Sequence, residues 1–346
     1  MDRFELRRQD FSLDEDQKAL QTSVAEFFAK QCPTGTVRAA EPLGFDEDLW
    51  RRVLDLGVAS MSLPEARGGD DATLVDLVLI AEELGRAVAP VPLVGHAVAT
   101  RLLARAGASD EVLAPAARGD RVFALAPAAV RNGRRQLVPD AAVAADVLAL
   151  SGDKLALHSA AGPAPHVANQ GSTPLAWWAP DPGQERVVLA VGDEARDLHR
   201  AAVAEWRLLT AAALVGLTEA ALHLAVEFAK TRRTMGVPIG TLQGVAFPLA
   251  DVAIAVSGAR NLVWKAAWLT EHEPGSRPEL PLMAFDYAVR TATHGTTTSA
   301  HMQGGLGFTA EADASLYFLR AKGWSLLAVG PGENLQDIGD LITGTD

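Results

Sequence analysis

The sequence is almost free of cysteine, because Cys32 is the only one among its 346 residues. An internal disulfide is therefore impossible, and the paired cysteines of a structural zinc site are absent. The eight histidines show no HExxH spacing, so the sequence predicts no metal site. A chain without disulfides suits a reducing compartment, and we expect a cytoplasmic protein.

Positive charge is also scarce. The 31 basic residues are outnumbered by 43 acidic ones, which gives a formal net charge of -12. Such a chain repels a nucleic-acid backbone and an anionic membrane surface, so we expect neither as a general partner. An anion that binds this protein has to be met by a local cluster of cations.

Several other signals are missing. The N-terminal segment MDRFELRRQDFSLDEDQ contains no apolar core of a signal peptide, and no run of about 18 uncharged apolar residues indicates a membrane span. The chain has no GxSxG nucleophile motif, no GxxxxGK phosphate loop and no internal repeat. These absences predict a soluble, unprocessed globular protein.

The chain has ample material for a core, since 49% of its residues are hydrophobic. Ser12 and Glu15 have the spacing of a capping box, and the apolar residues that follow recur on one helical face: Leu20, Val24, Phe27 and Phe28. Further helical patterns cover 49–54 and 74–84. We predict an α-helical domain over residues 1–119.

The pattern changes in the middle of the chain. Between residues 120 and 203, short β-prone segments alternate with Gly, Pro, Asn and Asp: 121–125, 137–138, 147–150 and 187–191. From 204 to 346 the pattern is helical again, and 208–230 is apolar around much of its circumference, which predicts burial on more than one face, including against a partner subunit. The predicted fold is therefore mainly α with a small middle β domain.

Two short stretches carry the candidate chemistry. Residues 230–243 read KTRRTMGVPIGTLQ, which places cations, a Gly-Pro break and a lone glutamine between two apolar helices. Residues 301–308 read HMQGGLGF. Arginine is a permanently charged, forked donor, and glycines let main-chain N–H groups approach an anion closely.

These stretches resemble motifs of the acyl-CoA dehydrogenase family. That family carries R-x-Q-F-G-x-P-I-x-x-x-Q, and residues 232–243 match it except that Thr234 replaces Gln and Met235 replaces Phe. Residues 301–307 are similar to the family's Q-x-x-G-G-x-G, with His301 in place of the first Gln. The segments 56–69 and 82–86 also resemble the family, so the likeness covers nearly the whole chain.

The resemblance implies a fold, a cofactor and a set of binding residues. The fold is an N-terminal helical domain, a middle β domain and a C-terminal four-helix bundle, and the cofactor is FAD. In such enzymes the diphosphate and adenine of FAD lie across a subunit interface, where the neighbouring chain contacts them. The residues that would make these contacts here are Arg232, Met235, Gln243, His301, Gly304 and Gly305.

Each of these residues also has an ordinary structural explanation. Arg232 at a helix end can simply complement the helix dipole, and the pair Gly304–Gly305 can be a helix C-cap. Met235 can fill a gap, and His301 can be a surface histidine. The common spacing of all of them favours the cofactor interpretation.

The catalytic base of the family is missing from this sequence. The resemblance places the family's catalytic Glu at one of two positions, which hold Ala328 and Arg290 here. The T-E-P-x-x-G-S-D segment that should follow 122–127 is also absent, and the chain continues directly into 128–146. The chain's own flavin and thioester contacts are therefore expected to be lost.

Three hypotheses remain open. The first is the short subunit of an α₂β₂ acyl-CoA dehydrogenase, whose catalytic partner supplies the Glu; several such heteromers act on CoA thioesters of steroid side chains, which implies a bulky acyl-CoA substrate and an electron-transfer acceptor. The second is a self-sufficient homo-oligomer whose base has moved to Asp286 or Glu333. The third is a scaffold that binds no flavin.

Overall fold

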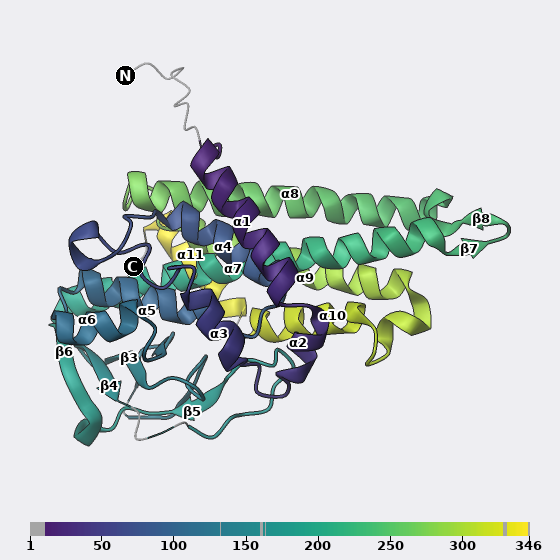
Figure 1. Cartoon of the computed structure of the whole chain (residues 1–346). Helices are drawn as coiled ribbons and strands as arrows, with labels where there is room; N and C mark the ends of the chain where they lie inside the picture. The colour runs from purple at the N-terminus through teal and green to yellow at the C-terminus, as the bar shows by residue number, and fades with distance from the viewer. Residues whose placement is uncertain (1–10, 132, 160–161, 163, 328–330, 345–346) are drawn as a thin grey trace, which may run out of the picture.

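A computed structural model describes residues 11–131, 133–159, 162, 164–327 and 331–344 (Figure 1). Over this part of the chain, helices dominate both ends and a small β region lies between them. The predicted class, mainly α with a small middle β domain, is confirmed.

The N-terminal third is a set of short helices. They are α1 (Glu15–Gln31), α2 (Thr34–Ala39), α3 (Glu47–Leu54), the 3-10 turn η1 (Glu65–Arg67), α4 (Leu74–Arg86), α5 (Leu93–Arg105) and α6 (Asp110–Ala117). The predicted capping box at Ser12 and Glu15 is wrong by two residues. The cap is formed by Asp14, whose carboxylate accepts the Gln17 N–H at 2.8 Å, while the Gln17 side chain accepts the Asp14 N–H at 3.2 Å.

The middle of the chain forms two small sheets. A four-stranded sheet has the order β1-β3-β4-β6, built from β1 (Phe123–Leu125), β3 (Asp146–Ser151), β4 (Lys154–Ser159) and β6 (Glu185–Val191). β1 pairs with β3 in parallel, and the other pairs are antiparallel. A separate antiparallel pair joins β2 (Gln136–Val138) to β5 (Ala176–Trp178), and the 3-10 turn η2 (Pro182–Gln184) precedes β6.

The C-terminal half is a helical bundle built around α7 (Gly192–Thr231). α7 has 40 residues and is about 60 Å long at 1.5 Å per residue. Around it lie α8 (Gln243–His272), α9 (Leu280–Met302) and α10 (Asp313–Ser325). The last helix, α11 (Pro331–Thr343), packs against α9. The predicted domain boundary after residue 203 falls inside α7.

The second apolar face of α7 is covered by the chain itself. Every residue from 205 to 218 is buried, because α4 packs on the side of α7 that the bundle leaves free. The two backbones approach so closely that a Cβ on Gly85 would lie 1.9 Å from the Ala213 carbonyl oxygen, and one on Gly216 would lie 1.9 Å from that of Glu82. The prediction that a partner subunit buries a second face of 208–230 was therefore wrong over 208–218.

The exposed apolar helix is α8 instead. By length and composition alone, both α7 and α8 could cross a membrane, but 67% of the most apolar window of α7 is buried and only 22% of that of α8. Phe247 and Ile254 on α8 are 59% and 70% exposed. α8 therefore packs along one side on α7 and α9 and leaves an apolar face uncovered.

Candidate functional site

The stretch 230–243 forms a hairpin that projects from one end of the bundle (Figure 1). α7 ends where the Arg232 N–H bonds the Phe228 carbonyl at 2.8 Å, and the short strands β7 (Arg233–Thr234) and β8 (Val237–Pro238) pair in antiparallel fashion. The Ile239 N–H then bonds the Arg232 carbonyl at 2.8 Å and closes the hairpin. The 3-10 turn η3 (Ile239–Thr241) leads into α8, whose first residue is Gln243.

The tip of the hairpin is a two-residue turn. Met235 and Gly236 both have positive φ, at 49° and 83°, which is the conformation that such a turn needs between twisted strands. Met235 pays a steric cost that Gly236 does not, and its side chain is 96% exposed. The Met235 side chain, for which an apolar contact was predicted, therefore points outward, and nothing in the described chain covers it.

The two arginines at the base of the hairpin differ. A guanidinium nitrogen of Arg233 donates to the Gly236 carbonyl oxygen at 3.1 Å and so braces the turn. Arg232 is exposed, and its side chain makes no hydrogen bond or ion pair with the described residues. The forked donor of Arg232 is thus free to meet an external anion.

The glycine motif forms the turn between α9 and α10. His301 is exposed in the last turn of α9, and the 3-10 turn η4 (Gly304–Phe308) follows. A Cβ on Gly307 would lie 2.3 Å from the Ala300 carbonyl oxygen, so packing within the chain requires that glycine. A Cβ on Gly305 would meet nothing within 4 Å, and its φ is not positive. Packing among the described residues therefore gives no steric reason for a glycine at position 305.

A small apolar cluster brings the two motifs to the same end of the bundle. Met302, next to His301, packs with Ile239 of η3 and Val245 of α8 against buried alanines of α7, Ala225 and Ala229. This contact ties the end of α9 to the base of the hairpin. Large apolar side chains are exposed around both motifs: Val237, Leu242, Phe247, Leu306 and Phe308.

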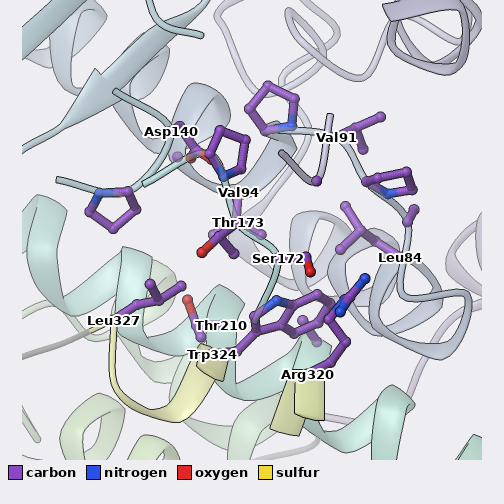
Figure 2. A pocket seen from close by; sticks show the side chains of 18 of the residues that line it. Leu84, Val91, Val94, Asp140, Ser172, Thr173, Thr210, Arg320, Trp324 and Leu327 are labelled. Atoms are coloured by element: carbon purple, nitrogen blue, oxygen red, sulfur yellow. The ribbon is translucent and has the colours of Figure 1, made fainter. Parts of the chain in front are cut away.

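The chain's own pocket lies elsewhere, between α5, α7 and α10 (Figure 2). Leu327 lines it, and Ala328, the expected position of the missing base, lies outside the described residues. The cavity is only about 70 Å³. Trp206 and Trp324 line it, and the Trp324 indole N–H donates to the Gly171 carbonyl at 3.2 Å, which holds the 171–174 segment against α10.

The candidate replacement bases do not lie in this pocket. Asp286 forms an ion pair with Arg290 one turn later on α9, with an Nε–Oδ2 distance of 2.9 Å, and Arg290 itself is exposed. Glu333 is exposed on α11 and borders a different cleft. Neither carboxylate is aimed at the cavity that Leu327 lines.

That second cleft is larger, about 1200 Å³, and lies between the 127–136 segment, the start of α7 and the α8–α9 turn. Its walls carry both signs of charge. Arg105 forms an ion pair with Glu205, and Arg207 forms one with Asp337. Burial lowers the pKa of the Arg207 guanidinium. Sequence reasoning missed this cleft, because its arginines are scattered over four segments.

Asp140 is a further group that the sequence did not single out. It follows β2 with a φ of 63°, and a Cβ on Gly95 of α5 would lie 2.4 Å from its carboxylate oxygen. Burial raises the pKa of the Asp140 carboxyl to about 7. No motif or periodicity marks this position.

Comparison with known proteins agrees with this geometry. Residues 14–120 match the acyl-CoA dehydrogenase N-terminal domain, and residues 197–338 match the acyl-CoA dehydrogenase C-terminal domain. Acyl-CoA dehydrogenase IpdE2 of Mycobacterium tuberculosis is 31% identical over 329 residues, which cover 93% of this chain and 96% of that protein. The chain belongs to the acyl-CoA dehydrogenase family. The resemblance predicted from the sequence is confirmed, and FAD is the cofactor of this family.

Other relatives are similar over the same length. Benzylmalonyl-CoA dehydrogenase of Aromatoleum aromaticum is 29% identical over 94% of this chain and 97% of its own. In the ChsE4-ChsE5 complex from Mycobacterium tuberculosis, a chain superposes with a TM-score of 0.83 and 26% identity, over 97% of this chain and 100% of that one. A chain of the Tcur3481-Tcur3483 steroid ACAD gives a TM-score of 0.83 and 27% identity, over 96% of this chain and 98% of that one.

Proposed function

We propose that this chain is a subunit of a heteromeric, FAD-dependent acyl-CoA dehydrogenase. It contributes the half-site for the diphosphate and adenine of an FAD that the partner subunit holds, and the partner supplies the catalytic Glu. The observation that carries the proposal is the contrast between an exposed, unpaired Arg232 on a projecting hairpin and a cavity of only about 70 Å³ beside Leu327, the residue before the position expected for the base.

The outward-facing half-site fits the cofactor's chemistry. Arg232 provides a permanent charge for the diphosphate, and charge-assisted hydrogen bonds to phosphate are among the strong ones in proteins. Gly305 leaves room for a phosphate oxygen to reach the main chain, and its lack of a steric role in this chain supports an external contact. Gln243 and His301 are exposed at the same end of the bundle and can hydrogen-bond the adenosine part.

Dehydrogenation of an acyl thioester requires a catalytic base, and the described part of this chain has no such base near the cavity that Leu327 lines. Removing the α proton of an acyl thioester needs a positioned base, whose loss costs about 10²–10⁴-fold in rate. FAD, when bound, accepts the hydride from the β carbon. Asp286 is held by Arg290, and Glu333 borders another cleft, which favours a base supplied by the partner.

The partner and the substrate class are supported by two solved structures. One is a complex of two differently named chains, ChsE4 and ChsE5, and the other is named as a steroid ACAD. We infer that the assembled enzyme is an α₂β₂ heteromer, that its acyl-CoA substrate carries a bulky group of the steroid side-chain type, and that an electron-transfer acceptor reoxidises the flavin.

Purification of the chain alone and after co-expression with a full-length acyl-CoA dehydrogenase that carries the catalytic Glu tests the proposal. The expected result is a colourless chain alone and a yellow complex, whose native mass corresponds to two copies of each subunit. A yellow, active chain alone would establish the homo-oligomer instead, and a colourless preparation in every combination would establish the scaffold.

A further inference from the structure

The 70 Å³ cavity that Leu327 borders has the properties of a small binding site in its own right (Figure 2). Most of its wall is apolar, and the wall comes from the end of α4, the 88–95 segment, α7, α10 and the loops at 139–140 and 172–174. Trp206 and Trp324 supply two flat aromatic surfaces. A pocket that is largely apolar and carries a few polar groups is the usual form of a small-molecule site.

Most polar groups in this wall are already satisfied by the protein. The Thr210 hydroxyl donates to the Trp206 carbonyl at 2.8 Å, and the Thr173 hydroxyl donates to the Asn169 side chain at 3.1 Å. The Trp324 indole N–H is used by Gly171. The hydrogen-bonding capacity left for a ligand therefore lies with the Ser172 hydroxyl, which makes no hydrogen bond with the described residues, and with the two ionisable residues of the wall.

Arg320 is the first of these residues. It is 2% exposed, and among the described residues its side chain makes one hydrogen bond, from Nη2 to the Glu41 carboxylate at 2.7 Å. Guanidinium has five N–H donors, so donors remain for another partner. Burial lowers the pKa of Arg320 despite Glu41, which indicates that a single, partly exposed carboxylate compensates its charge incompletely.

Asp140 is the second, and Figure 2 shows it on a different side of the same space from Arg320. Its side chain makes no hydrogen bond with the described residues, and it sits against Gly95 at the start of α5. Burial raises the pKa of this carboxyl to about 7, so a substantial fraction is uncharged at neutral pH. Among the residues that line the cavity, Asp140 and Arg320 are the charged or titratable pair.

We propose that this cavity binds a short-chain carboxylate, with the carboxylate on the free N–H groups of Arg320 and the alkyl chain between Trp206 and Trp324. The volume holds about five water-sized spheres, which corresponds to a chain of about four carbons. The acid form of Asp140 permits binding, whereas its anion repels a second negative charge. The site is separate from the FAD half-site, and neither depends on the other.

Butyrate and its uncharged isostere butyramide are the probes, and the full-length chain is titrated with each while tryptophan fluorescence is followed. Trp206 and Trp324 report directly on the cavity. We expect butyrate to bind at least tenfold more tightly than butyramide. Equal affinities, or no butyrate binding, would overturn the proposal without bearing on FAD.

Two variants distinguish a role of Arg320 in binding the ligand from a role of the Arg320–Glu41 ion pair in stabilising the fold. Arg320→Gln and Glu41→Gln both break the same ion pair, but only the first removes the ligand's partner. We expect a loss of tenfold or more in butyrate affinity for Arg320→Gln, and unchanged or tighter binding for Glu41→Gln. Equal losses in both variants would mean that the pair acts only through the fold and would refute the assignment.

A pH series and a thioester complete the test. Butyrate affinity should fall as the pH rises through about 7 in the wild type, because Asp140 ionises, and should stay level in Asp140→Asn. A pH-independent wild type would contradict the role of Asp140. If butyryl-CoA displaced butyrate and bound Arg320→Gln as well as the wild type, the cavity would be an acyl chamber and the proposal would fail.

Discussion

Arg232→Ala is the substitution that bears most directly on the FAD half-site. Arg232 is exposed and makes no hydrogen bond or ion pair with the described residues, so its removal leaves no partner unsatisfied. Surface substitutions of this kind change the free energy of unfolding by less than about 0.5 kcal/mol. The melting temperature of the chain should therefore stay close to that of the wild type.

The cofactor affinity of the complex should change far more. A hydrogen bond to a charged group contributes about 1.5–3 kcal/mol. Since each 1.4 kcal/mol is about tenfold in an equilibrium constant, the loss of Arg232 should weaken FAD binding by roughly 10- to 150-fold. The effect should shrink at high salt, because the diphosphate contact is electrostatic and solvent-accessible.

Flavin fluorescence during titration of the FAD-free complex measures this affinity, and Arg233→Ala is the matched control. Arg233 carries the same charge one residue away, but its guanidinium is engaged with Gly236. We expect Arg233→Ala to weaken FAD binding by less than about threefold, as a long-range charge does. An Arg232→Ala complex with wild-type FAD affinity, or equal losses in both variants, would refute the assignment of Arg232 to the diphosphate.

Three further predictions concern the glycine turn, the candidate bases and the buried acid. Gly305→Ala should leave the melting temperature of the chain unchanged and weaken FAD binding by the complex. Gly307→Ala should lower the free energy of unfolding by about 1–3 kcal/mol, because the added Cβ would clash with a main-chain carbonyl of α9. The reverse pattern would contradict the half-site. Asp286→Asn and Glu333→Gln should each leave the dehydrogenase rate of the complex within about twofold, and a loss of about 10²-fold or more would identify a base in this chain. Because the folded pKa of Asp140 is about 7 and an unfolded Asp titrates near 4, the free energy of unfolding should fall by about 3 kcal/mol as the pH rises from 4 to 7, and denaturation of Asp140→Asn should lack this slope.

The sequence predicted the elements whose own residues determine them. The helical face of α1 and the Gly-Pro break between two apolar helices are local patterns, and both appear in the structure, whereas the β-hairpin that forms the break was not predicted. β4 was missed because 154–159 is rich in alanine and leucine, with little of the β-branched signal that marks a strand. Its six-residue pairing with β3, a tertiary contact, makes it a strand.

Packing between segments that are distant in the chain could not be predicted from the sequence. The coverage of α7 by α4 depends on Gly85 and Gly216, which lie 131 positions apart and face each other's helices. Arg320 and Asp140 are similarly far apart in the chain, and only the fold brings them to one cavity. A motif of twelve residues was enough to propose the outward half-site, whereas no local motif marks the cavity.

The most direct test of the central claim is the flavin content and acyl-CoA dehydrogenation rate of the purified chain, measured without and with its partner. The account predicts no bound FAD and no turnover for the chain alone, and both with the partner. Stoichiometric FAD and turnover of an acyl-CoA thioester by the chain alone would contradict it.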